Sequence, residues 1–153
     1  MNDAFPSHIS GVLQDGHHIL PVRVYYEDTD FSGVVYHASY LRFMERGRTN
    51  LLRLVGVDHR ALFDETERQA PGFHFVVRAM TLEFVKAARM DDVLEVVTTP
   101  HEMKGASITL HQQVRRDGET LLDAKVKVAF VSGGRAQRIP KPLRTALESL
   151  RKP

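Results

Sequence analysis

One long amphipathic segment constrains the fold of this chain more than any other feature of its sequence. Its apolar positions recur at spacings of three and four residues: Tyr40, Met44, Gly47, Leu51 and Leu54. This spacing predicts a helix, with Ser39 as its N-cap and Gly56 as its stop. Because Gly47 costs the helix about 1 kcal/mol, we expect another element to approach the helix closely there. A helix of this kind cannot bury its apolar side alone and must lie on a sheet.

The rest of the sequence is typical of strands joined by tight turns, with shorter helices predicted over 58–68 and 143–150. Alternating or β-branched apolar residues predict strands over 20–26, 73–86, 93–99, 106–114 and 122–130. The segment 73–86 carries apolar residues on both faces, which predicts a strand buried on both sides. A three-residue loop over 116–118 would align the apolar faces of the last two strands and place Gly118 in the left-handed conformation.

These elements predict a single α+β domain over residues 20–153, preceded by an extension of residues 1–19. A chain of 153 residues can form one hydrophobic core of this kind. The 21 basic and 19 acidic side chains nearly balance, which argues against binding of duplex nucleic acid through a basic face. The sequence has no apolar run long enough to cross a bilayer and no secretory signal at its start. We therefore expect a cytoplasmic protein.

The cysteine and histidine content excludes several kinds of chemistry. The sequence contains no cysteine, which excludes disulfides, thiolate metal sites and a cysteine nucleophile. Its eight histidines show no spacing typical of a metal site, and no glycine-rich phosphate loop occurs. We therefore expect neither a metal nor another cofactor.

Basic residues gather toward the C-terminal end of the chain. Residues 134–153 contain six basic side chains and one acidic side chain, a net charge of +5, so residues 1–133 carry −3. A solvated basic tail is the common explanation of such a segment, and binding of an anionic partner is the alternative.

Three carboxylates, Glu27, Asp28 and Asp30, crowd between a predicted strand and the start of the long helix. A helix N-terminus exposes backbone N–H groups and a partial positive charge. A carboxylate facing it across a substrate carbonyl can act as general base or nucleophile, while an N–H stabilises the oxyanion. However, the sequence from Asp30 to Gly33 also fits a type I turn, in which the aspartate only bonds the local backbone. The spacing alone leaves both roles open.

The run from Tyr26 to Arg48, YEDTDFSGVVYHASYLRFMERGR, resembles the signature of the 4-hydroxybenzoyl-CoA thioesterase family. Within this family it is most similar to the YbgC-type acyl-CoA thioesterases associated with the Tol–Pal system. The likeness continues through FVVR at 75–78 and FVKAARMDD at 84–92, and covers about residues 20–133. It implies a hotdog fold, an antiparallel sheet wrapped around a long central helix. It also implies hydrolysis of acyl-CoA to free acid and coenzyme A, by a homodimer or tetramer with sites at the subunit interface.

The resemblance implies roles for individual residues. Asp30 matches the catalytic carboxylate, and His37 matches the position whose backbone N–H polarises the thioester carbonyl. Tyr36 and Glu45 match positions near the acyl group, although Glu45 could equally bond a neighbouring side chain. Two further residues could hold the phosphates of coenzyme A, with a solvated sheet edge as the alternative: Lys86 and Arg89.

Two other functions fit the same sequence. A non-catalytic adaptor linked to envelope maintenance would use the acyl groove or the basic tail to bind acyl groups or acyl carrier protein. A dehydratase on the same fold is the other alternative, and the absence of a histidine-based hydratase motif counts against it. The sequence does not predict the length of the acyl chain.

Overall fold

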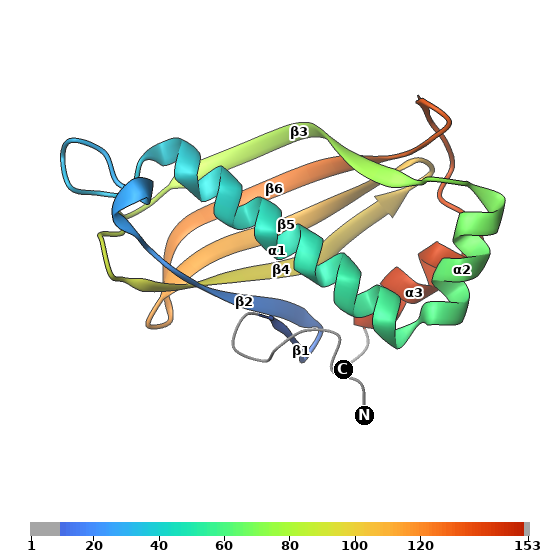
Figure 1. Ribbon diagram of the computed structural model, residues 1–153, viewed down its shortest axis with the longest axis horizontal. Coiled ribbons are helices and arrows are strands. Elements are labelled where there is room, and N and C mark those ends of the chain that lie inside the picture. The colour runs from blue at the N-terminus through green and yellow to red at the C-terminus, as the bar shows by residue number, and fades with distance from the viewer. Residues whose placement is uncertain (1–9, 152–153) are drawn as a thin grey trace.

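A seven-stranded antiparallel sheet curves around one long helix in the computed structural model, which describes residues 10–151 (Figure 1). The strands are β1 (Val12–Gln14), β2 (His17–Arg23), β3 (His74–Phe84), β4 (Val93–Lys104), β5 (Ser107–Arg116), β6 (Glu119–Ser132) and β7 (Arg135–Ala136). Their order in the sheet is β1-β2-β4-β5-β6-β3, and β7 pairs with β6. The predicted antiparallel sheet around a long helix is confirmed. Residues 1–9 of the predicted extension and residues 152–153 of the basic segment lie outside the described residues.

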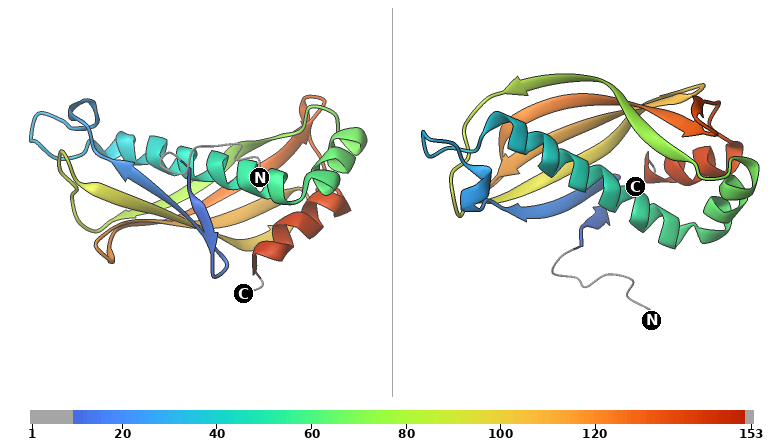
Figure 2. Two further views of the ribbon diagram at one scale, coloured as in Figure 1. Left: turned by 60° about the horizontal axis from the view of Figure 1, so that its bottom comes forward. Right: turned by 45° about the horizontal axis from the view of Figure 1, so that its top comes forward.

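The helices are α1 (His37–Asp58), α2 (Arg60–Gln69) and α3 (Lys141–Glu148), with short 3-10 turns at Tyr26–Asp28 and Ser149–Arg151. The helix α1 runs along the concave face of the sheet, and α2 and α3 lie together near its C-terminal end (Figure 2). Between residues 10 and 151, no helix is both long and apolar enough to span a membrane.

The ends of α1 differ from the prediction. The helix begins at His37 with Tyr36 as N-cap, so Ser39 lies inside the first turn and its N–H donates to the Tyr36 carbonyl at 2.8 Å. It also continues past Gly56, because this glycine makes room for Phe63 of α2, whose ring would lie 3.1 Å from a Cβ there. The predicted cap and stop were therefore wrong, and at Gly56 the packing of α2 on α1 overrides the local signal.

The close approach predicted at Gly47 is confirmed. A Cβ atom at this position would lie 2.8 Å from Cγ1 of Val96 on β4 and 3.3 Å from Nε2 of Gln112 on β5. Val96 and Gln112 are both fully buried, so neither has free space into which to move. Gly47 therefore sets how closely α1 lies on the sheet.

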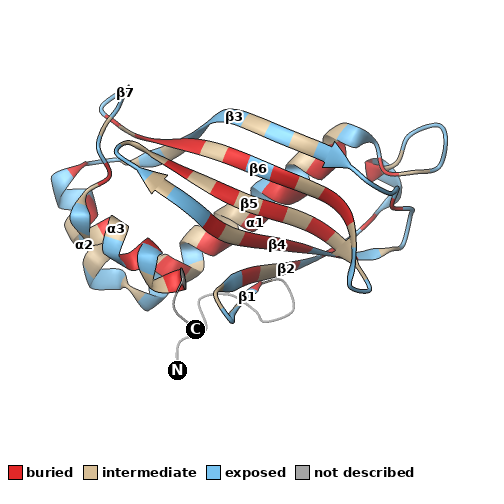
Figure 3. Cartoon of the chain, turned by 180° about the vertical axis from the view of Figure 1, so that it is seen from behind, coloured by how far each residue is buried: buried red, intermediate tan, exposed pale blue. Residues whose placement is uncertain are grey.

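The strand β3 is not buried on both sides, contrary to the prediction. It pairs only with β6 and forms one edge of the sheet, with exposed side chains along much of its length (Figure 3). Val76, Val77 and Phe84 are 46%, 43% and 49% exposed. The register shifts between Val77 and Ala79, which marks a β-bulge at Arg78. The apolar composition of β3 thus exceeds what one copy of the chain buries.

The hairpin between β5 and β6 keeps the predicted alignment by a different route. Val114 pairs with Leu122, so the apolar faces match as predicted. The loop has only two residues, Asp117 and Gly118, both with positive φ (52° and 79°), so the predicted three-residue loop was wrong. The register shift after Val114 accommodates Leu121 as the extra residue, and its carbonyl accepts the N–H of Val85 at 2.8 Å.

The segment 134–151 is folded rather than a solvated tail. Three side chains of α3 are buried in the core: Leu143, Ala146 and Leu147. Arg144 donates to the carbonyl of Gly105 at 3.3 Å. Arg135, Arg138 and Lys141 remain exposed, so the positive charge lies on the surface of a packed element.

A short N-terminal hairpin is held on α1 by Asn50. The strands β1 and β2 are joined by a turn at Asp15 and Gly16, and β2 spans the predicted boundary between residues 19 and 20. Oδ1 of Asn50 accepts the N–H of Gly11 at 2.9 Å and lies 2.6 Å from Nε2 of His18. His18 is fully buried, and its Nδ1 has no partner among the described residues.

Burial lowers the pKa of His18, against the opposing effect of its hydrogen bond with Asn50. Below about pH 6.5 the unfolded chain therefore binds a proton that the folded chain does not. We expect the free energy of unfolding to fall as the pH drops through this window, by at most about 1.4 kcal/mol per pH unit for this group. Urea unfolding of the parent and of His18→Gln, which keeps a donor for Asn50, measures the effect. The same pH dependence in both proteins would contradict it.

Candidate functional site

The acidic segment before α1 folds around Asp28. The Asp28 side chain is buried, and its Oδ2 accepts the N–H of Tyr25 at 2.8 Å. Its carbonyl accepts the N–H of Tyr36 at 2.9 Å, which links the segment to the start of α1. Asp28 therefore stabilises the local backbone.

Asp30 is exposed at the turn that follows. Its Oδ1 accepts the N–H of Ser32 at 2.8 Å, and its carbonyl accepts the N–H of Gly33 at 3.0 Å, with φ of +82° at Gly33. The turn predicted for this sequence is therefore formed. It engages only one oxygen of the carboxylate among the residues that the structure describes, which leaves the other for a substrate or a water molecule.

His37 places its backbone N–H at the N-terminus of α1, among the four donors that a helix leaves without intrahelical acceptors. Its ring lies 4.4 Å from that of Tyr36 and 6.5 Å from that of Phe84, between ring centres. Tyr40 packs on Phe84 at 5.8 Å, and its hydroxyl accepts the N–H of Ala88 at 3.0 Å. Burial raises the pKa of Tyr40, so its hydroxyl stays neutral and serves to position the loop. The C-terminal end of β3 therefore lies beside the start of α1.

Lys86 and Arg89 lie at the same end of the molecule. The segment that carries them is bound to the turn, since Val35 donates to the carbonyl of Ala88 at 2.8 Å and Val34 forms a β-bridge with Arg89. The ammonium of Lys86 is paired with Glu119 at 2.6 Å, and both groups are about half exposed. The side chain of Arg89 is exposed. Arg89 thus lies on a segment bonded to the turn of Asp30, and the ammonium of Lys86, three residues earlier, is already paired.

The segment is fixed further by Asp92, which accepts the N–H of Arg89 and a guanidinium hydrogen of Arg116, both at 2.8 Å. Although partial burial opposes it, these two bonds hold the pKa of Asp92 below its usual value. The carboxylate therefore stays charged at neutral pH and holds the backbone that carries Arg89.

Glu45 is not beside Asp30 in the same chain. It lies eight residues after His37, about 12 Å further along the helix axis. Its Oε1 accepts the hydroxyl hydrogen of Thr49 at 2.7 Å. Glu45 instead stands at the rim of a cavity of about 210 Å³ between α1 and the sheet.

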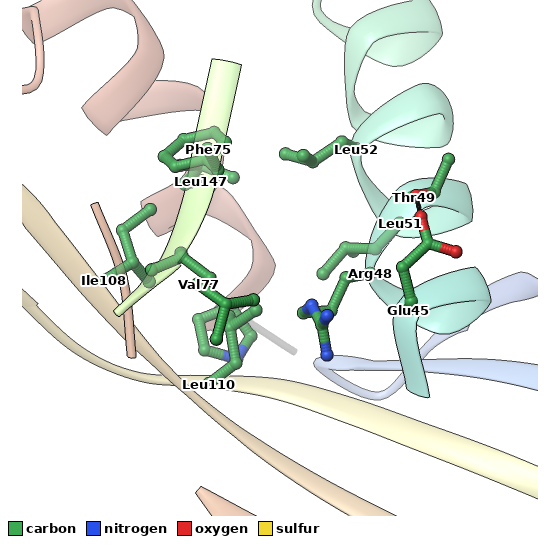
Figure 4. Close-up of a pocket in the computed structure, with 12 residues that line it drawn as sticks. Glu45, Arg48, Thr49, Leu51, Leu52, Phe75, Val77, Ile108, Leu110 and Leu147 are labelled. Carbon is green, nitrogen blue, oxygen red and sulfur yellow. Dashed lines mark hydrogen bonds between the residues drawn. The ribbon is translucent and has the colours of Figure 1, made fainter. Parts of the chain in front are cut away.

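The cavity separates side chains of α1 from side chains of β3 and β5 (Figure 4). Three polar side chains line one end of the cavity: Glu45, Arg48 and Thr49. The rest of its lining is apolar: Leu51, Leu52, Phe75, Val77, Pro100, Ile108, Leu110, Val128 and Leu147. Arg48, which the sequence analysis did not single out, donates to Oε1 of Gln112 at 3.0 Å, and burial lowers the pKa of its guanidinium. The sequence did hold a signal for Arg48, namely its position next to Gly47. The residue that follows a close contact between helix and sheet lies at the edge of the buried face.

Within residues 10–151, no group of three or more histidine, aspartate or glutamate side chains is placed to hold a metal ion. The chemistry that this end of the molecule offers is that of an exposed carboxylate on the turn that leads into a helix N-terminus. Such a pair can activate or supply a nucleophile and stabilise the oxyanion that forms when it attacks a carbonyl.

The family model of the thioesterase-like superfamily matches residues 24–147. Because this match spans most of the chain, the protein belongs to the thioesterase-like superfamily, and its sheet wrapped around α1 is the hotdog fold. The resemblance to YbgC-type thioesterases is confirmed by curated relatives, and the protein is a thioester hydrolase.

Two relatives and one solved structure document this likeness. The acyl-CoA thioesterase YbgC of Haemophilus influenzae is 42% identical over 133 residues, which cover 86% of this chain and 94% of that protein. The acyl-CoA thioester hydrolase YbgC of Escherichia coli is 49% identical over 112 residues, covering 72% of this chain and 79% of that protein. A probable thioesterase from Bartonella henselae superposes with a TM-score of 0.68 at 38% identity, covering 81% of this chain and 98% of that structure.

Proposed function

We propose that this protein hydrolyses acyl-CoA thioesters with Asp30 as general base or nucleophile and the His37 N–H as oxyanion donor. The observation that carries the proposal is the division of labour between two aspartates two residues apart. Asp28 is buried and bonded to the backbone, whereas Asp30 is exposed, with one oxygen unengaged, at the N-terminus of α1.

Both routes through Asp30 balance. As a base, Asp30 takes a proton from water, the hydroxide attacks the carbonyl carbon, the carbon–sulfur bond breaks, and the thiolate takes up the proton. As a nucleophile, Asp30 attacks the carbonyl and expels the thiolate, and water then hydrolyses the mixed anhydride. In each case the N–H of His37 stabilises the negative oxygen, because the helix N-terminus carries a partial positive charge.

The proposal assigns Lys86 and Arg89 to the phosphates of coenzyme A. The backbone contacts that tie Ala88 and Arg89 to the turn that carries Asp30 support it. Lys86 would exchange Glu119 for a phosphate. Because Lys86 and Glu119 are both exposed, breaking their ion pair costs little free energy. Tyr36, 44% exposed next to His37, would contact the group at the thioester.

We further propose that two copies join through the β3 edges into one continuous sheet, as a dimer or as half of a tetramer. The exposed apolar side chains of β3, and its free hydrogen-bonding edge, support this arrangement. Phe31, fully exposed at the tip of the turn beside Asp30, is a further apolar side chain for the second copy to cover.

Ala79, the midpoint of β3, tests this dimer, because the chain has no cysteine of its own. In an antiparallel pair centred on the midpoint, opposing Cα atoms lie about 5 Å apart, within reach of a disulfide. We expect oxidised Ala79→Cys to run as a covalent dimer on a non-reducing gel. Ala61→Cys, at an exposed position of α2, should remain uncrosslinked. A parent protein that sediments as a monomer at all concentrations would contradict the proposal.

A panel of acyl-CoA substrates with detection of the released thiol tests the proposed activity. The expected result is thiol release that depends on the acyl group. The alternative, a non-catalytic adaptor, predicts no release with any chain and retained binding of acyl carrier protein. Exposed arginines on α1, Arg42 and Arg46, favour an acidic protein as a further partner in either case. A link to the Tol–Pal system, which rests on the family resemblance, and a cytoplasmic location, which rests on the sequence, complete the proposal.

A further inference from the structure

The cavity under α1 is large and apolar enough to hold part of a substrate. Apart from the polar side chains at its rim, nine aliphatic or aromatic residues surround its volume of about 210 Å³. An apolar cavity of about 150 Å³ accommodates benzene, with six carbon atoms. By the same ratio, this cavity holds a chain of about eight carbon atoms.

Within one copy, this cavity is badly placed for the thioester at Asp30. The rim at Glu45 lies about 12 Å along the helix from His37, and Arg48 lies a further turn away. The strand β3 runs from the cavity to the start of α1, with one of its ends at each place. Phe84, at its C-terminal end, packs beside His37, whereas Phe75 and Val77, near its N-terminal end, line the cavity.

The dimer proposed above removes this difficulty. In an antiparallel pair of β3 strands centred on Ala79, Phe84 of a second copy lies opposite His74, about 5 Å across the strand pair. The start of α1 of that copy is thereby brought beside the cavity of this one. A thioester held at one Asp30 can then extend its acyl chain into the cavity of the other copy.

We infer that this cavity receives the acyl chain of a medium-chain substrate of about eight carbon atoms, bound at Asp30 of a second copy. Leu147 of α3 and Val77 of β3 limit the length and width of the chain. The inference rests on the proposed function and deepens it, because it names the substrate class. The folded C-terminal segment thereby contributes a wall to the site, through a side chain that is 3% exposed.

Two adjacent valines on β3 provide the sharpest test. Val77 pairs with Val128 and lines the cavity, whereas Val76 pairs with Ala129 on the opposite face, and the two are exposed to nearly the same extent. We expect Val77→Phe to lower kcat/KM for octanoyl-CoA, relative to butanoyl-CoA, by at least about 10-fold. Val76→Phe should leave this ratio unchanged. Equal effects of the two variants on the ratio would overturn the inference.

Leu147 and Leu143 provide a second, independent pair. Both are buried side chains of α3, but only Leu147 lines the cavity. Leu147→Ala is expected to shift the preferred chain length upward by about three carbon atoms, the number removed from the side chain. Leu143→Ala should keep the parental preference. If the alanine variants do not fold, the valine pair decides alone.

The outcomes separate this inference from the proposed activity. Parent protein that hydrolyses acyl-CoAs with no dependence on length, or that prefers acetyl-CoA or the acid-terminated succinyl-CoA, overturns the inference and leaves the activity standing. Parent protein that releases no thiol overturns the activity. In that case binding of octanoate, measured by calorimetry on the parent, Val77→Phe and Val76→Phe proteins, tests the cavity by itself. Weaker binding only in Val77→Phe supports it, and no binding to the parent overturns it.

Discussion

The Asp30→Asn protein is expected to fold like the parent and to hydrolyse acyl-CoA at least about 100-fold more slowly. Asparagine keeps an oxygen that can accept the Ser32 N–H, so the turn at Gly33 is preserved. What is lost is the negative carboxylate that, in the proposed mechanism, accepts a proton from water or attacks the carbonyl. The measurement is kcat with a saturating acyl-CoA, together with circular dichroism and the unfolding midpoint of both proteins.

Asp28→Ala is the matched comparison, two residues earlier. Removing its buried carboxylate deletes the bond to the Tyr25 N–H and is expected to cost roughly 1 kcal/mol of stability. The two variants should thus separate chemistry from folding, Asp30→Asn losing mainly rate and Asp28→Ala mainly stability. Parental turnover by Asp30→Asn would reduce Asp30 to a turn residue and end the proposed mechanism.

Gly47→Val is expected to lower the free energy of unfolding by roughly 3 kcal/mol. Even the first carbon of the new side chain would lie 2.8 Å from Cγ1 of Val96, a buried atom on a stiff β-branched side chain. Valine is a better helix former than glycine, so any loss reflects packing against the sheet rather than helix propensity. Urea unfolding with fluorescence or circular dichroism detection measures the change.

A second substitution can separate this clash from other causes. Val96→Ala removes the atom that the new side chain meets most closely, so the double variant should lose less stability than the sum of the two single losses. Gly56→Ala, on the same helix against the partly exposed ring of Phe63, should change stability far less. Strictly additive losses for Gly47→Val and Val96→Ala would show that the contact does not determine the position of α1.

The features that the sequence predicted most reliably are those that depend on residues close together in the chain. Asp30 and His37 are seven residues apart, and the strand-to-helix connection brings them to one end of the molecule. The close contact at Gly47 could be predicted because tight packing explains why a glycine stands on the apolar face of a helix. In contrast, Ser39 and Gly56 gave wrong helix ends, because contacts with Tyr36 and Phe63 outweigh the local signals.

The cavity could not be predicted, because its wall comes from residues distant in sequence. Leu52, Val77, Ile108 and Leu147 lie on four elements, and no local pattern connects them. The sequence correctly showed apolar residues on both faces of β3, but the burial of both faces that we predicted from them does not occur in one copy of the chain. In the same way, the alignment of β5 and β6 was correct although the loop was not, since the extra residue at Leu121 restores the register.

The uncovered edge of β3 also bears on how a single copy of this protein behaves if two copies pair as proposed. An extended edge of eleven residues that contains no proline offers its free N–H and C=O groups to any other extended chain. The bulge at Arg78, the charges of Arg78 and Glu83, and the polar side chains of His74 and Thr81 are what interrupt its apolar character. A variant that weakens pairing between copies would therefore expose an aggregation-prone segment. Subunit association would then protect the solubility of the enzyme as well as complete its site.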